Sequence, residues 1–194
     1  MTCFLAIGAF ASALAASEPR CDSLKGAPAE RLREFLTQRT PDDRSDPLCT
    51  EYALWTLGGN RDAASIPLFF KYITFKREPD DLEQFGAVHR IGPEYPAVDA
   101  LAALGPGRGE PEPEIIGAFR DYLSGPLTDL QRANAVEAFA GYYRGRQPAA
   151  VRYLAEQSKK LKGTPAEALR SAAELLAKRC SQKSRDACLQ ELER

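Results

Sequence analysis

The amino-acid sequence predicts an all-α fold, an α-solenoid of about four helical hairpins preceded by an N-terminal cap helix. Apolar residues recur at i, i+3, i+4 and i+7, as in the segment 131–144, which places them on one stripe of a helix. Ala-rich helical segments alternate with segments rich in aromatic and aliphatic residues. Gly58, Gly105 and Gly141 close three of the Ala-rich segments and lie 47 and 36 positions apart, near the period of stacked helix pairs.

The expected helices follow from this alternation. The first helix of each pair is expected at 52–59, 95–105, 132–141 and 168–178. The second helix of the first three pairs is expected at 65–75, 114–123 and 149–161. One amphipathic helix at 27–39 precedes the pairs, with its inward face formed by Leu32, Phe35 and Leu36. The chain therefore divides into residues 1–17, a cap helix and linker at 18–45, and a repeat domain at 46–194 with an insertion at 78–94.

Three helix starts carry local signals. Thr164 is followed by a proline and then by Glu167, the pattern of an N-cap residue, an N1 proline and a capping-box glutamate. Asp46, which precedes a proline, and Thr128 are expected to begin two further helices in the same way.

Two adjoining patterns resemble the short bacterial type of HEAT repeat. Thr56-Leu57-Gly58-Gly59 followed by Ile66-Pro67-Leu68 is similar to the Leu-Gly turn and Ile-Pro start of such repeats, and Ala103-Leu104-Gly105 is similar to the first half. The resemblance covers about residues 46–192, although the later two units lack both signatures. It implies a stack of helix pairs that acts as an interaction scaffold, with the second helix of each pair lining a concave surface.

The first seventeen residues differ in character from the rest of the chain. Cys3–Ala16 is an uncharged run of small and apolar residues that contains the A-x-A pattern Ala13-Leu14-Ala15. Fourteen residues are too few to cross a bilayer, which takes about 20, but they match the core of a signal peptide. No Lys or Arg precedes the run, so a retained anchor and a buried N-terminal helix stay open as alternatives. The prediction is a cleaved signal, a periplasmic or secreted protein, and no membrane segment after cleavage.

Cysteine usage agrees with export. Removal of residues 1–17 leaves Cys21, Cys49, Cys180 and Cys188, an even number that favours two disulfides in an oxidising compartment. Of the three possible pairings, sequence proximity favours Cys180–Cys188 and, by elimination, Cys21–Cys49. Free buried thiols are the alternative, and the spacing does not suit a metal site.

Overall charge argues against a nucleic-acid partner. The formal net charge of the 194 residues is -1, so no basic field attracts a phosphate backbone. His89, the one histidine, lies in the insertion 78–94 among acidic residues, but no nucleophile stands at a recognisable spacing from it. Glu110, Glu112 and Glu114 alternate with prolines that hold the segment extended, which favours a solvated loop over a calcium site. No metal and no cofactor are predicted.

Two aromatic and basic clusters are candidate contact surfaces for an unknown protein or peptide partner. The helix at 65–75 contributes Lys71 and Tyr72, and a hairpin turn contributes Tyr142, Arg144 and Arg146. Aromatic and Arg side chains are enriched at binding hot spots. The phenylalanines of the first cluster are expected to pack between hairpins instead.

The resulting functional hypothesis is a non-catalytic adaptor of the cell envelope or the secreted fraction, which binds its partner on the concave face of the stack. One alternative is an enzyme that uses His89 and the acidic residues of the insertion. Another is a purely structural envelope protein.

Overall fold

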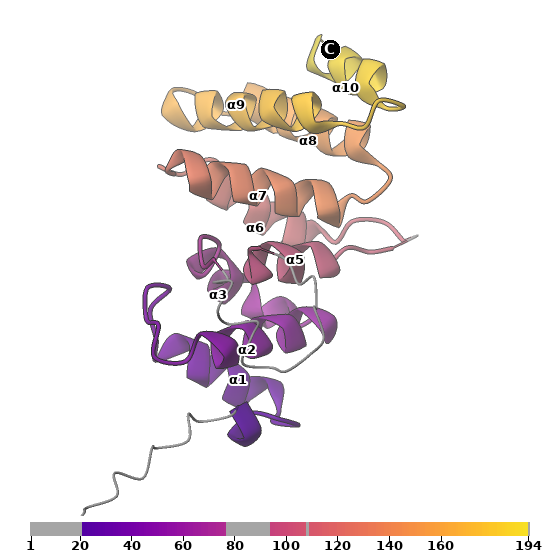
Figure 1. Ribbon diagram of the computed structural model, residues 1–194. Coiled ribbons are helices and arrows are strands. Elements are labelled where there is room, and N and C mark those ends of the chain that lie inside the picture. Colours follow the sequence, from indigo (N-terminus) through magenta and orange to yellow (C-terminus); the bar gives the residue numbers. More distant parts are fainter. Residues whose placement is uncertain (1–20, 77–93, 108, 194) are drawn as a thin grey trace, which may run out of the picture.

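The computed structural model describes residues 21–76, 94–107 and 109–193, and these form helices joined by turns, without a β-strand (Figure 1). The helices are η1 (Cys21–Ser23), α1 (Ala29–Thr37), α2 (Pro47–Gly59), η2 (Ala63–Ser65), α3 (Ile66–Lys71), α5 (Pro96–Ala103), α6 (Pro113–Leu123), α7 (Asp129–Tyr142), α8 (Gln147–Lys160), α9 (Thr164–Arg179) and α10 (Arg185–Glu193). The predicted all-α class is confirmed for this part of the chain. Residues 1–17 and most of the insertion 78–94 lie outside it.

Helix starts follow local sequence rules with two differences. Thr128 caps α7 as expected, and its side chain and that of Gln131 complete a reciprocal capping box. Thr164 is instead the first residue of α9, because Gly163 takes the N-cap position with a positive φ of 65° that glycine adopts without strain. Asp46 occupies the N-cap of α2, but its carboxylate accepts a hydrogen bond from Arg39 and does not cap the helix.

The Ala-rich helices contact one another in chain order. α2 contacts α5, α5 contacts α7, and α7 contacts α9. Two of the glycines at the ends of the Ala-rich segments, Gly58 and Gly141, lie where neighbouring helices approach closely. A Cβ at Gly58 would lie 2.6 Å from Ala100 Cα, and one at Gly141 would lie 2.6 Å from Ala102 Cβ. Neither position has room for a larger residue, so glycine lets these helices approach closely.

Aromatic side chains fill the space between the helices. Phe70 stacks on Tyr122 at a centroid distance of 4.1 Å, and Phe119 lies 4.9 Å from Phe139. The phenylalanines of the segment 65–75 are buried, as the sequence predicts. The α-helix in this segment ends at Lys71, however, so it is shorter than expected.

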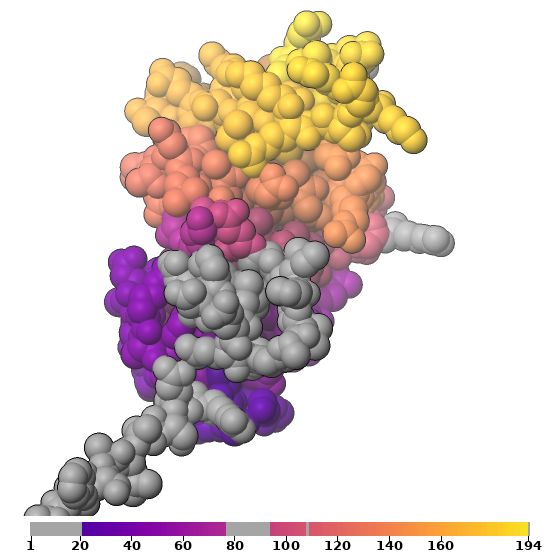
Figure 2. All heavy atoms as spheres, viewed as in Figure 1, coloured from indigo at the N-terminus to yellow at the C-terminus, as the bar shows by residue number. Residues whose placement is uncertain are grey.

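A disulfide bond lies near each end of the helix stack. The cysteines are paired as sequence proximity favours, Cys21 with Cys49 and Cys180 with Cys188. α1 contacts α2 and α3 at one end, and α10 contacts α8 and α9 at the other. In Figure 2 the described residues follow one another in sequence order from the indigo end of the molecule to the yellow end. No helix among the described residues has the length and apolar character needed to cross a bilayer.

Candidate functional site

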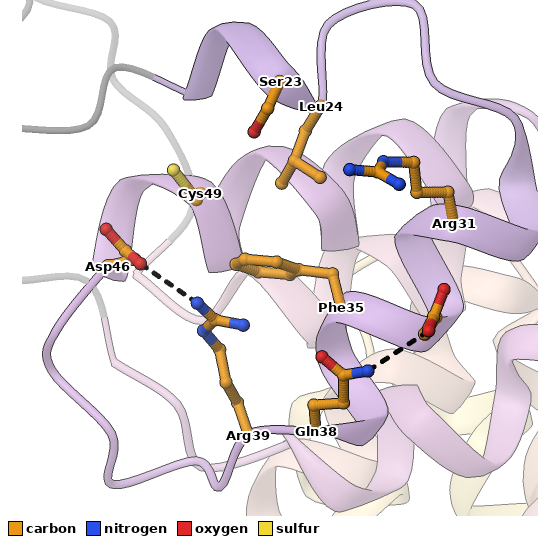
Figure 3. Close-up of a pocket in the computed structure, with 9 residues that line it drawn as sticks. Ser23, Leu24, Arg31, Phe35, Gln38, Arg39, Asp46 and Cys49 are labelled. Carbon is orange, nitrogen blue, oxygen red and sulfur yellow. Dashed lines mark hydrogen bonds and ion pairs between the residues drawn. The ribbon is translucent and has the colours of Figure 1, made fainter.

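A pocket opens between η1, α1 and the start of α2, at the indigo end of the stack (Figure 3). Its volume is about 260 Å³, and its lining residues are Ser23, Leu24, Arg31, Glu34, Phe35, Gln38, Arg39, Asp46 and Cys49. α1 supplies Arg31, Glu34 and Phe35, because positions spaced by three and four residues face one side of a helix, and Gln38 and Arg39 follow directly after its end. The pocket thus combines one aromatic ring with several charged and polar side chains.

Phe35 and Arg39 form the centre of the pocket. They are four residues apart, and the Arg39 guanidinium carbon lies 3.8 Å from the centroid of the Phe35 ring. Arg39 Nη2 donates to Asp46 Oδ2 at 3.1 Å, which links α1 to the start of α2. Arg39 Nε is buried without a hydrogen-bond acceptor, because Asp43 Oδ2 is 4.0 Å away and too distant.

One wall of the pocket depends on the Cys21–Cys49 disulfide. Cys49 lines the pocket itself, and Cys21 begins the short helix that carries Ser23. Leu24 follows directly and is buried. The disulfide therefore holds Ser23 and Leu24 opposite α1.

Some of the remaining polar side chains of the pocket have hydrogen-bond partners within the protein, and others do not. Gln38 Nε2 donates to Glu34 Oε1 at 3.2 Å, so this carboxylate already has a donor. The guanidinium of Arg31 and the hydroxyl of Ser23 have no hydrogen-bond partner in the described part of the chain. In Figure 3 the Arg31 guanidinium lies next to Leu24, across the Phe35 ring from Arg39.

The size and chemistry of the pocket suit recognition of one side chain. Small-molecule sites commonly have volumes of roughly 300–1,000 Å³, and this pocket is smaller at about 260 Å³. No three His, Cys, Asp or Glu residues of the described ranges lie together in a way that could hold a metal ion. The arrangement can bind an ionic or polar group above an aromatic ring.

The predicted contact residues of the segment 65–75 have structural roles. Tyr72 is fully buried, and its hydroxyl donates to the carbonyl oxygen of Leu36 at 2.8 Å. Burial raises the pKa of Tyr72 to about 12. Lys71 Nζ donates to the carbonyls of Leu36, Thr37 and Arg39 at the C-terminal end of α1. The prediction that Tyr72 contacts a partner is wrong because its side chain has no exposed surface, and Lys71 is engaged in capping α1.

In the second predicted cluster, Tyr142 and Arg146 also make contacts within the protein, whereas Arg144 is exposed. Tyr142 is buried, so the prediction of a surface contact is wrong, and its hydroxyl accepts a hydrogen bond from the backbone N–H of Glu112 at 2.8 Å. Arg146 donates to the carbonyl of Gly109 at 2.7 Å. Both residues therefore anchor the proline-rich turn that precedes α6. Arg144 is exposed, and it opposes the rise in the pKa of Asp99 that burial of that carboxyl group causes.

The carboxylates of the proline-rich turn and of the insertion are only partly described. Glu110, Glu112 and Glu114 are exposed, in agreement with a solvated turn. Glu94, at the end of the insertion, pairs with Lys76 at 2.9 Å. His89 lies outside the described residues.

Sequence reasoning missed the pocket. Phe35 packs against the core, as predicted for the inward face of the cap helix, but it is only partly buried, and its ring also lies beneath the guanidinium of Arg39. A useful signal was the i, i+4 spacing of Phe35 and Arg39, which brings an aromatic ring and a guanidinium together at the C-terminal end of α1. The pairing of Arg39 with Asp46 depends on how the linker folds back, and no pattern in the sequence encodes that.

The comparison with models of known protein families, with curated proteins and with solved structures finds no match to this chain. Its function is therefore argued from the geometry described above.

Proposed function

We propose that this chain is an exported, non-catalytic binding module in which a stack of HEAT-like helical hairpins presents a recognition surface to a protein or peptide. The ordered contacts of α2, α5, α7 and α9 support the repeat interpretation, because repeat proteins stack each unit on its neighbours. The close glycine–alanine approaches at Gly58 and Gly141 support it further, because the same packing device recurs along the stack.

The observation that carries the binding function is the pocket between η1, α1 and α2. Its volume of about 260 Å³ suits a single side chain of a partner. Arg39 belongs to a residue type enriched at binding hot spots, and Phe35 to one enriched in the buried core of interfaces. The exposed guanidinium of Arg31 at the rim adds a charged group that a partner can reach. These features suit a recognition site better than a catalytic one.

Two disulfides support the compartment part of the proposal. Such bonds persist in oxidising compartments and are rare where thiols are kept reduced. In this proposal residues 1–17 act as a signal that is removed on export. Intact-mass measurement of the chain from its producing cells should show a mature protein that lacks about these residues. A mass that includes them would refute cleavage.

Site-specific photo-cross-linking tests the binding function. A photoreactive amino acid replaces Gln38 in the pocket, and a control chain carries it at Arg170, an exposed residue of α9 near the opposite end of the stack. Both chains are irradiated in extract from the producing cells, and the products are identified by mass spectrometry. A product specific to position 38 and competed by unmodified chain is expected. No specific product would refute the binding function and favour a structural role.

A further inference from the structure

The guanidinium groups of Arg31 and Arg39 line the pocket and differ in how their donors are used. Asp46 accepts from Arg39, and Glu34 accepts from Gln38, so both carboxylates are already engaged. Arg39 Nε is a buried donor without an acceptor, and the exposed guanidinium of Arg31 and hydroxyl of Ser23 have no protein partner in the described part of the chain. A buried donor without an acceptor destabilises the pocket that contains it. The two guanidinium groups therefore retain donors that an acceptor on a ligand can use.

An apolar surface lies beside these donors. The Phe35 ring is half-buried and lines the pocket, and Leu24 forms part of the opposite wall. Figure 3 shows the ring between the two guanidinium groups, with Leu24 above it. A ligand that reaches Arg31 thus also covers apolar surface.

We infer that the pocket binds a carboxylate carried next to an apolar group, as in an acidic side chain or the C-terminal residue of a peptide. This inference rests on the proposed binding function and names the chemistry of its ligand. The Arg31 guanidinium offers a planar fork of donors that matches a carboxylate with two parallel hydrogen bonds. The apolar part of the ligand packs against Phe35 and Leu24.

The charges of the lining argue for a single negative charge on the ligand. Glu34 and Asp46 remain within the pocket and repel a dianion more strongly than a monoanion. The lining carries two guanidinium groups and two carboxylates, so it has no excess positive charge to balance a doubly charged phosphate. A cationic ligand fits less well, because the guanidinium groups of Arg31 and Arg39 would repel it.

The test is a titration of the full chain with 3-phenylpropionate and with its uncharged amide, followed by NMR through the Arg31 Nε–Hε signal and the Phe35 ring signals. Saturable binding of the acid in the millimolar range is expected, with the amide weaker by about tenfold or more because it cannot accept a charge-assisted bidentate pair. Arg31→Gln should weaken binding of the acid to a similar extent. Arg170→Gln, which removes an exposed arginine from α9, should leave it unchanged.

Two peptide probes distinguish the source of the carboxylate. One is an amidated peptide with an internal Leu-Glu pair, and the other ends in phenylalanine with a free carboxylate. Stronger binding of either peptide identifies that source. Equal binding of the acid and the amide, or binding that Arg31→Gln leaves intact, overturns the inference.

The two proposals fail separately. If cross-linking from position 38 captures a partner while no carboxylate probe binds, the ligand chemistry is wrong and the binding function stands. If neither experiment gives a specific signal, both are wrong.

Discussion

The close approach of α2 and α5 makes a sharp prediction about two adjacent glycines. Gly58 and Gly59 both lie in the last turn of α2. A Cβ at Gly58 would meet Ala100 Cα at 2.6 Å and Ala100 Cβ at 2.8 Å, whereas a Cβ at Gly59 would meet nothing within 4 Å. Substitution by alanine therefore has opposite expected effects at two neighbouring positions of the same helix.

The magnitude follows from the geometry. Carbon atoms pack at about 3.5–4.0 Å, so Gly58→Ala forces α2 and α5 apart by about 1 Å. Overpacking of this kind costs about 1–3 kcal/mol, which outweighs the gain of about 0.5–1 kcal/mol from replacing a helical glycine. Gly59→Ala keeps that gain without the clash. The two variants share that gain, so they should differ in free energy of unfolding by the cost of the clash, about 1–3 kcal/mol, or by about 2–12 °C in Tm.

The assay is denaturant unfolding of the oxidised chain followed by far-UV circular dichroism, with a thermal melt as a second readout. Gly117→Ala in α6, where an added Cβ also meets nothing within 4 Å, controls for the general effect of alanine in a helix. If Gly58→Ala is as stable as Gly59→Ala, the two helices do not approach as described, and the argument for repeated close packing fails.

Three further perturbations test other contacts. Replacing both Cys21 and Cys49 by serine opens a loop with a sequence separation of 28, and the chain-entropy relation predicts a loss of about 3–4 kcal/mol in denaturant unfolding; an unchanged midpoint would show that the disulfide does not constrain the unfolded chain. The pKa of Tyr72 is raised to about 12 by burial, so its stabilisation is full below its ordinary pKa of about 10 and is lost as pH rises through about 12. Tyr72→Phe should be less stable than the parent by about 1 kcal/mol at neutral pH, and a stability gap that stays constant at alkaline pH would contradict this. Arg152 donates twice to the buried carboxylate of Glu191, both at 2.8 Å, so Glu191→Gln should speed amide hydrogen exchange in α10 but not in α2, and equal exchange in parent and variant would count against that anchor.

The overall helical class was predictable because it depends on local properties. The spacing of apolar residues identifies a buried face wherever a helix forms, and burial of Phe69, Phe70 and Phe75 agrees with it. Gly58 and Gly141 lie at close helix contacts, which the spacing of the glycines along the chain did not predict. Helix ends were less predictable. Gly163, with its positive φ, displaced Thr164 from the N-cap of α9.

The candidate site was less predictable than the fold. An aromatic or basic residue carries the same sequence signature whether it meets a partner or a carbonyl of its own chain. Lys71 meets the end of α1, and Arg146 meets the proline-rich turn, at sequence separations of 32 to 37. Such contacts depend on which backbone lies opposite the side chain, and helical periodicity contains no information about that.

By itself the sequence determined that the described part of the chain is helical, which faces of its helices are apolar, and which cysteines are near enough along the chain to be favoured as partners. The tertiary structure alone decided that Tyr72 and Tyr142 are interior residues and that η1, α1 and α2 enclose a pocket around Phe35 and Arg39. The physical reason is the distance along the chain over which each property is determined. Helix formation and amphipathic patterning act over a few neighbouring residues, whereas a pocket exists only where distant segments meet and leave space between them.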